Sequence, residues 1–324
     1  MIKRRHKLIN AIGIGSSQVL SAFTGRPLVW GMPPSVSVEL TNNCNLRCPE
    51  CASGSGYSER ETGFMNPDLY RKVIAELGPY LFSINLYFQG EPMVHPRFFE
   101  FLELTGKTRS VVSTNGHFLS PENAEKLALS GLDKLIVSLD GLNQEIYSKY
   151  RLGGDFNKVI NGIRNISDAI TRTGSHLKLE IQFLVNRYNE GQLKEAGKFA
   201  AESGAFLRLK SMQVIDIKDS EKWMPVQKRF RRYTELNGRY KIKSSLPDRC
   251  MRLWFNPVIT WDGKVLPCCF DKKEEFVMGD LNEETFSDIW RGKDYEKFRE
   301  DVLSARSKIG ICRNCTAGLY GVRY

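Results

Sequence analysis

The sequence lacks any long apolar run. Its 324 residues include no segment that reaches the length of about 18 apolar residues needed for a membrane-spanning helix. The stretch Leu8–Phe23 follows a basic start, but glycine and polar residues interrupt it and no clear cleavage site follows. We therefore expect a soluble, cytoplasmic protein in which this stretch forms an amphipathic helix packed on the main domain. Peripheral contact with a membrane is the alternative.

Cysteine is absent between Cys51 and Cys250. The eight cysteines fall into two clusters instead, each with the spacing of metal ligands. In a chain without a convincing export signal, this distribution favours metal binding in a reducing compartment and argues against disulfides. Low-complexity segments are also missing, which excludes a broadly disordered protein.

Acidic residues are fewer than basic ones, and the formal net charge is +10. The densest basic run is Lys228–Arg232, followed by Arg239, Lys241 and Lys243. No recognisable nucleic-acid-binding fold surrounds it, so no nucleic-acid partner is expected. The run would suit a phosphate-bearing or otherwise anionic substrate.

Residues 35–211 alternate between short apolar runs and longer helical patterns. Six runs read as buried strands, namely Ser35–Leu40, Phe82–Phe88, Arg109–Ser113, Asp133–Leu139, Leu177–Val185 and Ala205–Ser211. The helical patterns are Asn66–Leu77, Pro96–Gly106, Pro121–Leu129, Phe156–Arg172 and Glu190–Ser203. Repeated β-then-α units predict an α/β fold, a partial (β/α)6 barrel with its active site at the carboxyl ends of the strands.

The first cysteine cluster, Cys44, Cys48 and Cys51, occupies a loop after the first predicted strand. Thiolates suit zinc or an iron–sulfur cluster. A structural zinc site needs four ligands, and no fourth Cys or His lies nearby. Three thiolates on a four-iron cluster leave one iron open for a small molecule, which favours cofactor chemistry over zinc.

This CxxxCxxC loop after a first strand resembles the signature of the radical S-adenosylmethionine (SAM) superfamily, and the resemblance covers about residues 33–211. Further segments match it after successive strands: Gln89-Gly90-Glu91-Pro92, Ser113-Thr114-Asn115-Gly116 and Ser138-Leu139-Asp140-Gly141. The resemblance implies SAM contacts at Gly90, Glu91, Pro92, Ser113, Asn115, Ser138, Asp140, Arg151 and Asn186. Glu50 departs from the pattern, because the family often has an aromatic residue there, beside the adenine.

The resemblance also implies the chemistry. A [4Fe-4S] cluster would bind SAM and cleave it reductively to a 5′-deoxyadenosyl radical, which takes a hydrogen atom from the substrate. A reductant such as flavodoxin or ferredoxin would supply the electron.

The second cluster contains Cys250, Cys268, Cys269, Cys312 and Cys315, and Asp262-Gly263 predicts a hairpin turn within it. Together with Met278-Gly279-Asp280 and Ser287–Trp290, it resembles a shortened SPASM or twitch-like domain with one auxiliary [4Fe-4S] cluster. The ligands so implied are Cys250, Cys268, Cys312 and Cys315. Cys269 would replace Cys268, act on substrate or simply pack as a buried thiol, and structural zinc is the alternative for this site.

These patterns predict four regions: an N-terminal extension at 1–32, a radical SAM core at 33–211, a basic linker at 212–249 and an auxiliary-cluster domain at 250–324. The predicted function is a radical SAM oxidoreductase or maturase, acting on a small metabolite or carbohydrate or on a peptide. The residues before the first strand are too few for a leader-binding domain, so a small molecule is at least as well favoured. A zinc-ribbon nucleic-acid-binding protein without catalysis is the alternative.

Overall fold

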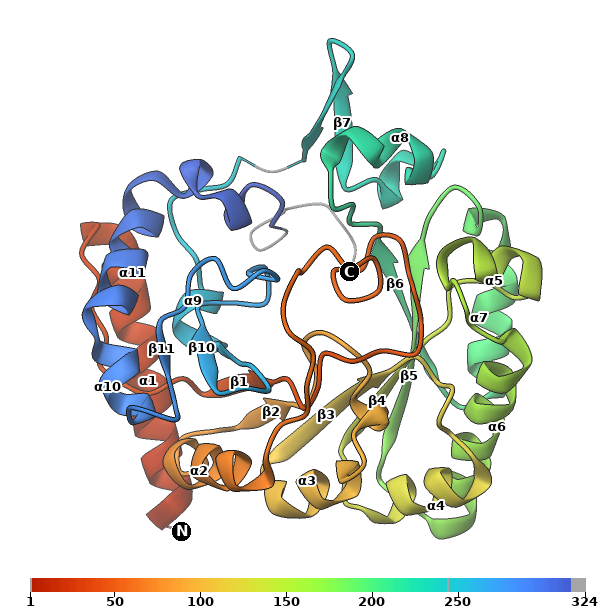
Figure 1. Cartoon of the computed structure of the whole chain (residues 1–324), viewed down its shortest axis with the longest axis horizontal. Coiled ribbons are helices and arrows are strands. Elements are labelled where there is room, and N and C mark those ends of the chain that lie inside the picture. The colour runs from red at the N-terminus through yellow and green to blue at the C-terminus, as the bar shows by residue number, and fades with distance from the viewer. Residues whose placement is uncertain (1, 244, 316–324) are drawn as a thin grey trace.

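Six parallel strands form the wall of an incomplete barrel (Figure 1). The computed structural model describes residues 2–243 and 245–315. The strands neighbour one another in chain order: β1 Ser35–Val38, β2 Ser83–Asn85, β3 Arg109–Thr114, β4 Lys134–Ser138, β5 Lys178–Val185 and β6 Phe206–Ser211. All six overlap the predicted runs, so the prediction of a partial (β/α)6 barrel is confirmed. Parallel strands require crossover connections, and the intervening helices supply them.

The crossover helices cover the outside of this sheet (Figure 1). They are α2 Pro67–Leu77, α3 Phe98–Thr105, α4 Pro121–Leu129, α5 Gln144–Tyr150, α6 Phe156–Thr173 and α7 Leu193–Glu202. Helix α4 begins as its sequence predicts, since the Ser120 side chain accepts a hydrogen bond from the Asn123 amide and Pro121 follows. Helix α6 buries Val159, Ile163 and Ile166 completely against the strands. The short helix α5 was not predicted.

The C-terminal region extends the barrel sheet. Strand β9 (Val258–Ile259) pairs in parallel with β1, so that Ser37 faces Val258. Strands β10 (Lys264–Leu266) and β11 (Gly279–Asp280) continue in antiparallel pairing, which makes nine strands in this sheet within the described residues. The hairpin predicted at Asp262-Gly263 is therefore present. The proposed core and auxiliary domains share one sheet.

Helices of the C-terminal region pack beside the N-terminal helix at one side of the molecule (Figure 1). They are α9 Arg252–Phe255, α10 Phe286–Arg291 and α11 Lys293–Ala305, and the N-terminal helix is α1 Ile2–Thr24. Helix α1 contacts α9, so the expected packing on the main body is confirmed. Over the described part of the chain, no helix has both the length and the apolar character needed to cross a membrane.

The predicted basic linker contains its own small elements. Helix α8 (Ser220–Trp223) is followed by strands β7 (Tyr233–Leu236) and β8 (Arg239–Ile242), which form a separate antiparallel hairpin. In Figure 1 this hairpin projects from the top of the molecule. Most of the basic run predicted at Lys228–Lys243 therefore lies on this hairpin and its approach.

Candidate functional site

The first cysteine loop lies over the open end of the barrel, near the centre of Figure 1. The Arg47 amide donates to the Leu152 carbonyl at 2.9 Å, and the Cys51 amide donates to the Cys48 carbonyl at 3.2 Å. Gly54 lets the loop close tightly, because a Cβ there would lie 2.6 Å from the Cys48 nitrogen. The loop therefore folds back on itself and is tied to the turn after α5.

Hydrogen-bond donors surround these thiols. The Leu46 amide lies 3.4 Å from the Cys44 sulfur, and the Asn115 side-chain nitrogen lies 3.9 Å from the same atom. The Arg151 guanidinium lies 3.8 Å from the Cys48 sulfur. Donors of this kind stabilise the anionic sulfur ligands of an iron–sulfur cluster. The chemistry of the loop therefore fits a [4Fe-4S] cluster.

The number of thiols in the loop suits a cluster better than a single ion. Cys44, Cys48 and Cys51 are one ligand short of a tetrahedral zinc site, whereas three thiolates on a four-iron cluster leave one iron open. Burial raises the pKa of the Cys44 thiol to about 12, so ligation there would release a proton.

Glu91 joins three loops beneath the cysteines. Its buried carboxylate accepts hydrogen bonds from the Thr114 hydroxyl at 2.8 Å and from the Asn115 amide at 2.6 Å, while its own amide donates to the Asn43 carbonyl at 2.8 Å. Gly90 has a φ of +72°, and a Cβ there would lie 2.5 Å from the Thr41 carbonyl oxygen. Burial raises the pKa of Glu91 to about 7. The Gly90-Glu91-Pro92 segment is thus pressed against the cysteine loop.

Replacing Glu91 with alanine is expected to lower the free energy of unfolding by about 2–4 kcal/mol, because buried donors lose their charged acceptor. Chemical denaturation of the E91A variant measures this loss. Glu145, on the outer surface of α5, gives the matched control, and E145A should leave stability unchanged. Equal effects of the two variants would contradict this role for Glu91.

Arg151 and Asp140 form a buried ion pair on the other side of the loop. Their charged atoms lie 2.6 Å apart, and Asp140 also accepts from the Leu184 amide at 2.6 Å. Arg151 therefore bridges the carboxylate and the Cys48 sulfur. This pair brings together two of the residues implied as SAM contacts.

The other implied contacts lie around the same end of the sheet. Ser113 and Ser138 lie at the carboxyl ends of β3 and β4, and Pro92 begins a short 3-10 turn at Pro92–Val94. The buried Asn186 follows β5, where its side chain accepts from the Tyr188 amide at 2.9 Å and donates to the Leu184 carbonyl. Asn186 therefore serves the local turn here, and its contact with SAM stays a prediction.

The cysteines of the second cluster lie near two arginines, Arg306 and Arg252. The guanidinium of Arg306 lies 3.4 Å from the Cys315 sulfur. Burial lowers the pKa of Arg306. The charges of the nearby thiols Cys250, Cys315 and Cys312 outweigh this effect, so the pKa is raised overall. Cys268, Cys312 and Cys315 are buried.

The adjacent cysteines Cys268 and Cys269 point to different surroundings. Cys268 is buried. Burial raises the pKa of its thiol, and the charges of Cys269, Cys250 and Cys315 raise this pKa further. Cys269 lines a large cavity, with its sulfur 3.3 Å from the Arg252 guanidinium. Of these two adjacent cysteines, Cys269 lines the cavity and Cys268 is buried outside it.

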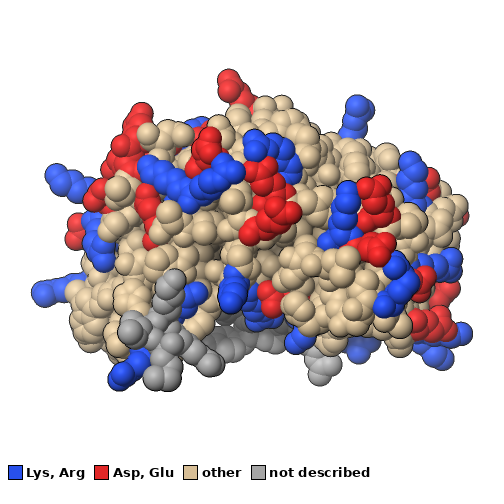
Figure 2. All heavy atoms as spheres, turned by 90° about the horizontal axis from the view of Figure 1, so that it is seen from below, with Lys and Arg blue, Asp and Glu red and all other residues tan. Residues whose placement is uncertain are grey.

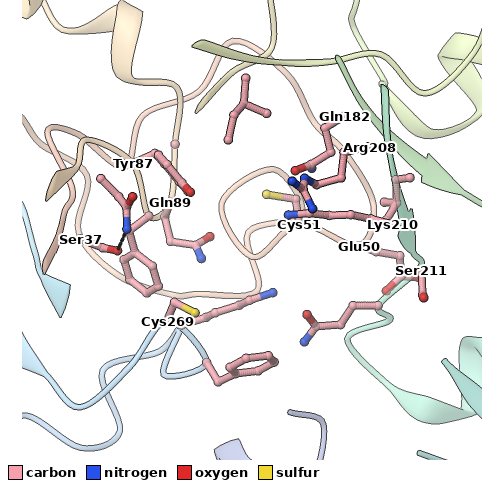
Figure 3. Close-up of a pocket in the computed structure, with 18 of the residues that line it drawn as sticks. Ser37, Glu50, Cys51, Tyr87, Gln89, Gln182, Arg208, Lys210, Ser211 and Cys269 are labelled. Carbon is pink, nitrogen blue, oxygen red and sulfur yellow. Dashed lines mark hydrogen bonds between the residues drawn. The ribbon is translucent and has the colours of Figure 1, made fainter. Parts of the chain in front are cut away.

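This cavity, of about 810 Å³, lies between the two cysteine regions and the inner face of the sheet. Figure 3 shows Cys51 and Cys269 on opposite sides of it, with Arg208 and Lys210 reaching in from β6. Glu50 also lines the cavity, and its carboxylate accepts from the Ile215 amide at 2.7 Å. Glu50 therefore ties the cysteine loop to the segment after β6.

Basic side chains outnumber acidic ones in the cavity wall. The cations are Lys134, Arg208, Lys210, Arg232, Arg252 and Lys272, against the carboxylates Glu50 and Glu180. Sequence reasoning missed Lys210 and Arg208, although their alternation with Leu207 and Leu209 in the predicted strand places both cations on one face. Of the predicted basic run, only Arg232 reaches this wall.

The outer surface shows no comparable concentration of positive charge on the face in Figure 2, where basic and acidic side chains are interspersed. Such a face does not provide the continuous basic track that nucleic acid requires.

Two family models match the chain. The radical SAM superfamily model matches residues 38–184, and the SPASM iron–sulfur cluster-binding domain model matches residues 250–316. Both matched families are iron–sulfur families, so the zinc-ribbon alternative has no support.

The curated relatives include mycofactocin maturase MftC of Mycolicibacterium smegmatis, 34% identical over 180 residues, which are 55% of this chain and 44% of the relative. The chain thus spans somewhat under half the length of that relative. The S-adenosyl-L-methionine-dependent 2-deoxy-scyllo-inosamine dehydrogenase of Niallia circulans is 24% identical over 86% of this chain and 91% of its own length.

Among solved structures, Streptococcus suis SuiB bound to precursor peptide SuiA has a TM-score of 0.63 at 16% identity, over 89% of this chain and 72% of SuiB. This likeness shows a shared fold. Family models, relatives and fold agree with the cysteine geometry, and the chain belongs to the radical SAM superfamily.

Proposed function

We propose that this protein is a radical SAM oxidoreductase or maturase whose substrate binds in the cavity between Cys51 and Cys269. The observation that carries the proposal is that one cavity meets both cysteine regions. When bound, the cluster and SAM supply a 5′-deoxyadenosyl radical, formed with methionine by one-electron cleavage of SAM, which takes a hydrogen atom from a substrate carbon.

The chain's own residues would position these groups. Cys44, Cys48 and Cys51 would hold the cluster, while Glu91 keeps the three loops around it in register. Arg151, fixed by Asp140, places positive charge beside the Cys48 sulfur. Loops held rigidly in this way orient a cofactor and keep water from its reactive part.

An auxiliary cluster held by Cys250, Cys268, Cys312 and Cys315 would supply an acceptor for the second electron of a two-electron oxidation. The Niallia circulans relative is named a dehydrogenase and the Mycolicibacterium smegmatis relative a maturase. Small molecules and peptides therefore both stay within the proposed substrate range.

The experiment is anaerobic reconstitution with iron and sulfide, chemical reduction, addition of SAM and quantification of 5′-deoxyadenosine. The proposal predicts catalytic formation of 5′-deoxyadenosine together with methionine. A protein that binds zinc in place of iron and leaves SAM intact would contradict it.

We further propose that the substrate carries an anionic oxygen group, a carboxylate or a phosphate, held between Lys210 and Lys272. The other lining cations already have partners. Lys134 and Arg208 pair with Glu180 at 2.6 and 2.9 Å, Arg252 contacts Cys269, and Arg232 donates to the Asn314 carbonyl. Neither Lys210 nor Lys272 forms an ion pair or a side-chain hydrogen bond with another described residue. Burial lowers the pKa of both lysines, and an anion between them would offset that cost.

The K210A/K272A variant should bind inorganic phosphate or citrate at least about tenfold more weakly than wild type, since each charged hydrogen bond contributes about 1.5–3 kcal/mol. Isothermal titration with each probe tells phosphate recognition from carboxylate recognition. The control K178A/K194A removes the same charge from exposed positions and should bind normally. If both variants bound the anions equally weakly, the loss of affinity would come from the change in net charge, which would contradict a specific site.

A further inference from the structure

Helix α1 exposes an apolar stripe along most of its length. Ile9, Ile12 and Phe23 are 68%, 60% and 85% exposed, and Leu8, Val19 and Leu20 are exposed beside them. The six positions fall within about a third of the helix circumference, so they lie on one face, in two groups that Gly15 and Ser16 separate. In Figure 1, α1 lies at the outer edge of the molecule.

The buried face of α1 is mostly polar, with Asn10, Ser17 and Ser21 buried beside the apolar side chain of Ile14. Asn10 donates to the Met32 carbonyl and accepts from the Met32 amide, both at 2.8 Å. The buried Ser21 hydroxyl accepts from the Leu28 amide at 2.8 Å, and the buried Ser17 hydroxyl accepts from the Trp30 amide at 3.3 Å. The helix thus uses its polar side chains to bind the segment 28–32.

This orientation is fixed along the helix. Gly13 and Gly31 allow the two segments to touch, because a Cβ on either would lie within 3.0 Å of an oxygen of the other segment. Turning the apolar stripe inward would break these contacts and leave buried backbone groups without partners. The stripe is therefore a permanent outer surface, and any bilayer would meet it side-on.

Charge identifies the kind of surface that would cover the stripe. Lys3, Arg4, Arg5, Lys7 and Arg26 precede the first carboxylate of the chain, Glu39. An apolar helix face next to a cluster of cations is the composition that binds in the interface of an anionic membrane. Two copies meeting through this face would instead bring like charges together.

The neighbouring surface has the same character. Trp30, 57% exposed, lies on the segment that α1 covers, and tryptophan is enriched at membrane interfaces. Val19 and Phe23 also line a hollow of about 710 Å³, together with Met251, Cys250 and the cations Arg249, Arg252 and Arg306. Positive charge there would attract an anionic headgroup.

We propose that α1 docks this protein peripherally on an anionic membrane surface, through its stripe Leu8, Ile9, Ile12, Val19, Leu20 and Phe23. The proposal is independent of catalysis, because α1 contributes no residue to the 810 Å³ cavity.

Flotation of the reconstituted protein with vesicles tests this proposal. The wild-type protein should bind phosphatidylcholine vesicles that contain phosphatidylglycerol more strongly than vesicles of pure phosphatidylcholine. This binding should weaken as the salt concentration rises. For the I12E/F23E variant, the fraction of protein bound to the vesicles should fall by at least about tenfold. Its control, L129E/V226E, adds the same charge at positions 66% and 71% exposed and should bind as wild type does.

Absence of wild-type binding to anionic vesicles would overturn the proposal, as would equal binding by I12E/F23E. A wild-type dimer that I12E/F23E converts to monomer, without vesicle binding, would assign the stripe to a second copy and also overturn it. Thermal unfolding of both variants checks that they are folded, and unchanged 5′-deoxyadenosine formation separates this outcome from a failure of the proposed function.

Discussion

Replacing Cys44, Cys48 and Cys51 with alanine is expected to abolish 5′-deoxyadenosine formation and to lower bound iron from about eight to about four atoms per chain. These thiols lie in one loop, under donors from Leu46 and Arg151, so no other cysteine in the described residues can replace them there. Product analysis and iron determination on the reconstituted variant measure both effects.

The complementary variant has alanine at Cys250, Cys268, Cys312 and Cys315. It should also retain about four irons, but these would be the irons that bind SAM. The two variants should therefore bind similar amounts of iron, but only the second should still form 5′-deoxyadenosine. Retention of about eight irons after loss of the first three cysteines would contradict the assignment.

The neighbours Cys268 and Cys269 should respond in opposite ways to alanine substitution. C268A should lose the auxiliary iron, because Cys268 is the proposed ligand and its sulfur is buried outside the cavity. C269A should keep all the iron, because its sulfur lies in the cavity beside Arg252. Iron content and the visible absorption of the clusters distinguish the two proteins.

The two variants have the same volume change at adjacent positions, so each controls for the other. If C269A lost the auxiliary iron and C268A kept all of it, Cys269 would be the ligand and Cys268 would not. If C269A keeps its iron but binds substrate poorly, the cavity-facing thiol acts on substrate instead of holding metal.

The barrel was predictable because its strands are buried on both sides. The run Leu135-Ile136-Val137 in β4 is continuously apolar and buried, as expected of a covered parallel strand, and the intervening helices carry clear start signals such as Ser120-Pro121. The spacing placed Cys44, Cys48 and Cys51 in one loop after the first strand, as the structure has them, whereas their role as cluster ligands was implied by the resemblance and stays a prediction.

Other features depend on long-range pairing that no local pattern records. The hairpin that contains strand β9, Val258–Ile259, was predicted from its turn, but the pairing of β9 with β1 joins residues more than two hundred positions apart. The place of Lys272 in the cavity wall follows from that pairing. Glu91 lay in a predicted motif, but its contacts with Thr114 and Asn115 required the fold.

Helix α1 shows a different limit. Its alternation of apolar and polar side chains predicts an amphipathic helix, and such helices ordinarily bury the apolar face. Here Asn10, Ser17 and Ser21 find backbone partners in residues 28–32, so the polar face turns inward. The period of the pattern identified the helix, whereas the choice of buried face depended on a neighbouring segment.

The central claim is that two iron–sulfur sites flank one substrate cavity, whose wall includes Cys51 of the first site and Cys269 beside the second, and that only the first site binds SAM. Electron paramagnetic resonance of the reduced, reconstituted protein, recorded before and after adding SAM, tests it most directly. We predict signals from two clusters, of which SAM alters one, and this altered signal is missing from the Cys44/Cys48/Cys51 variant. A spectrum that SAM leaves unchanged, or a protein whose metal is zinc, would contradict the account.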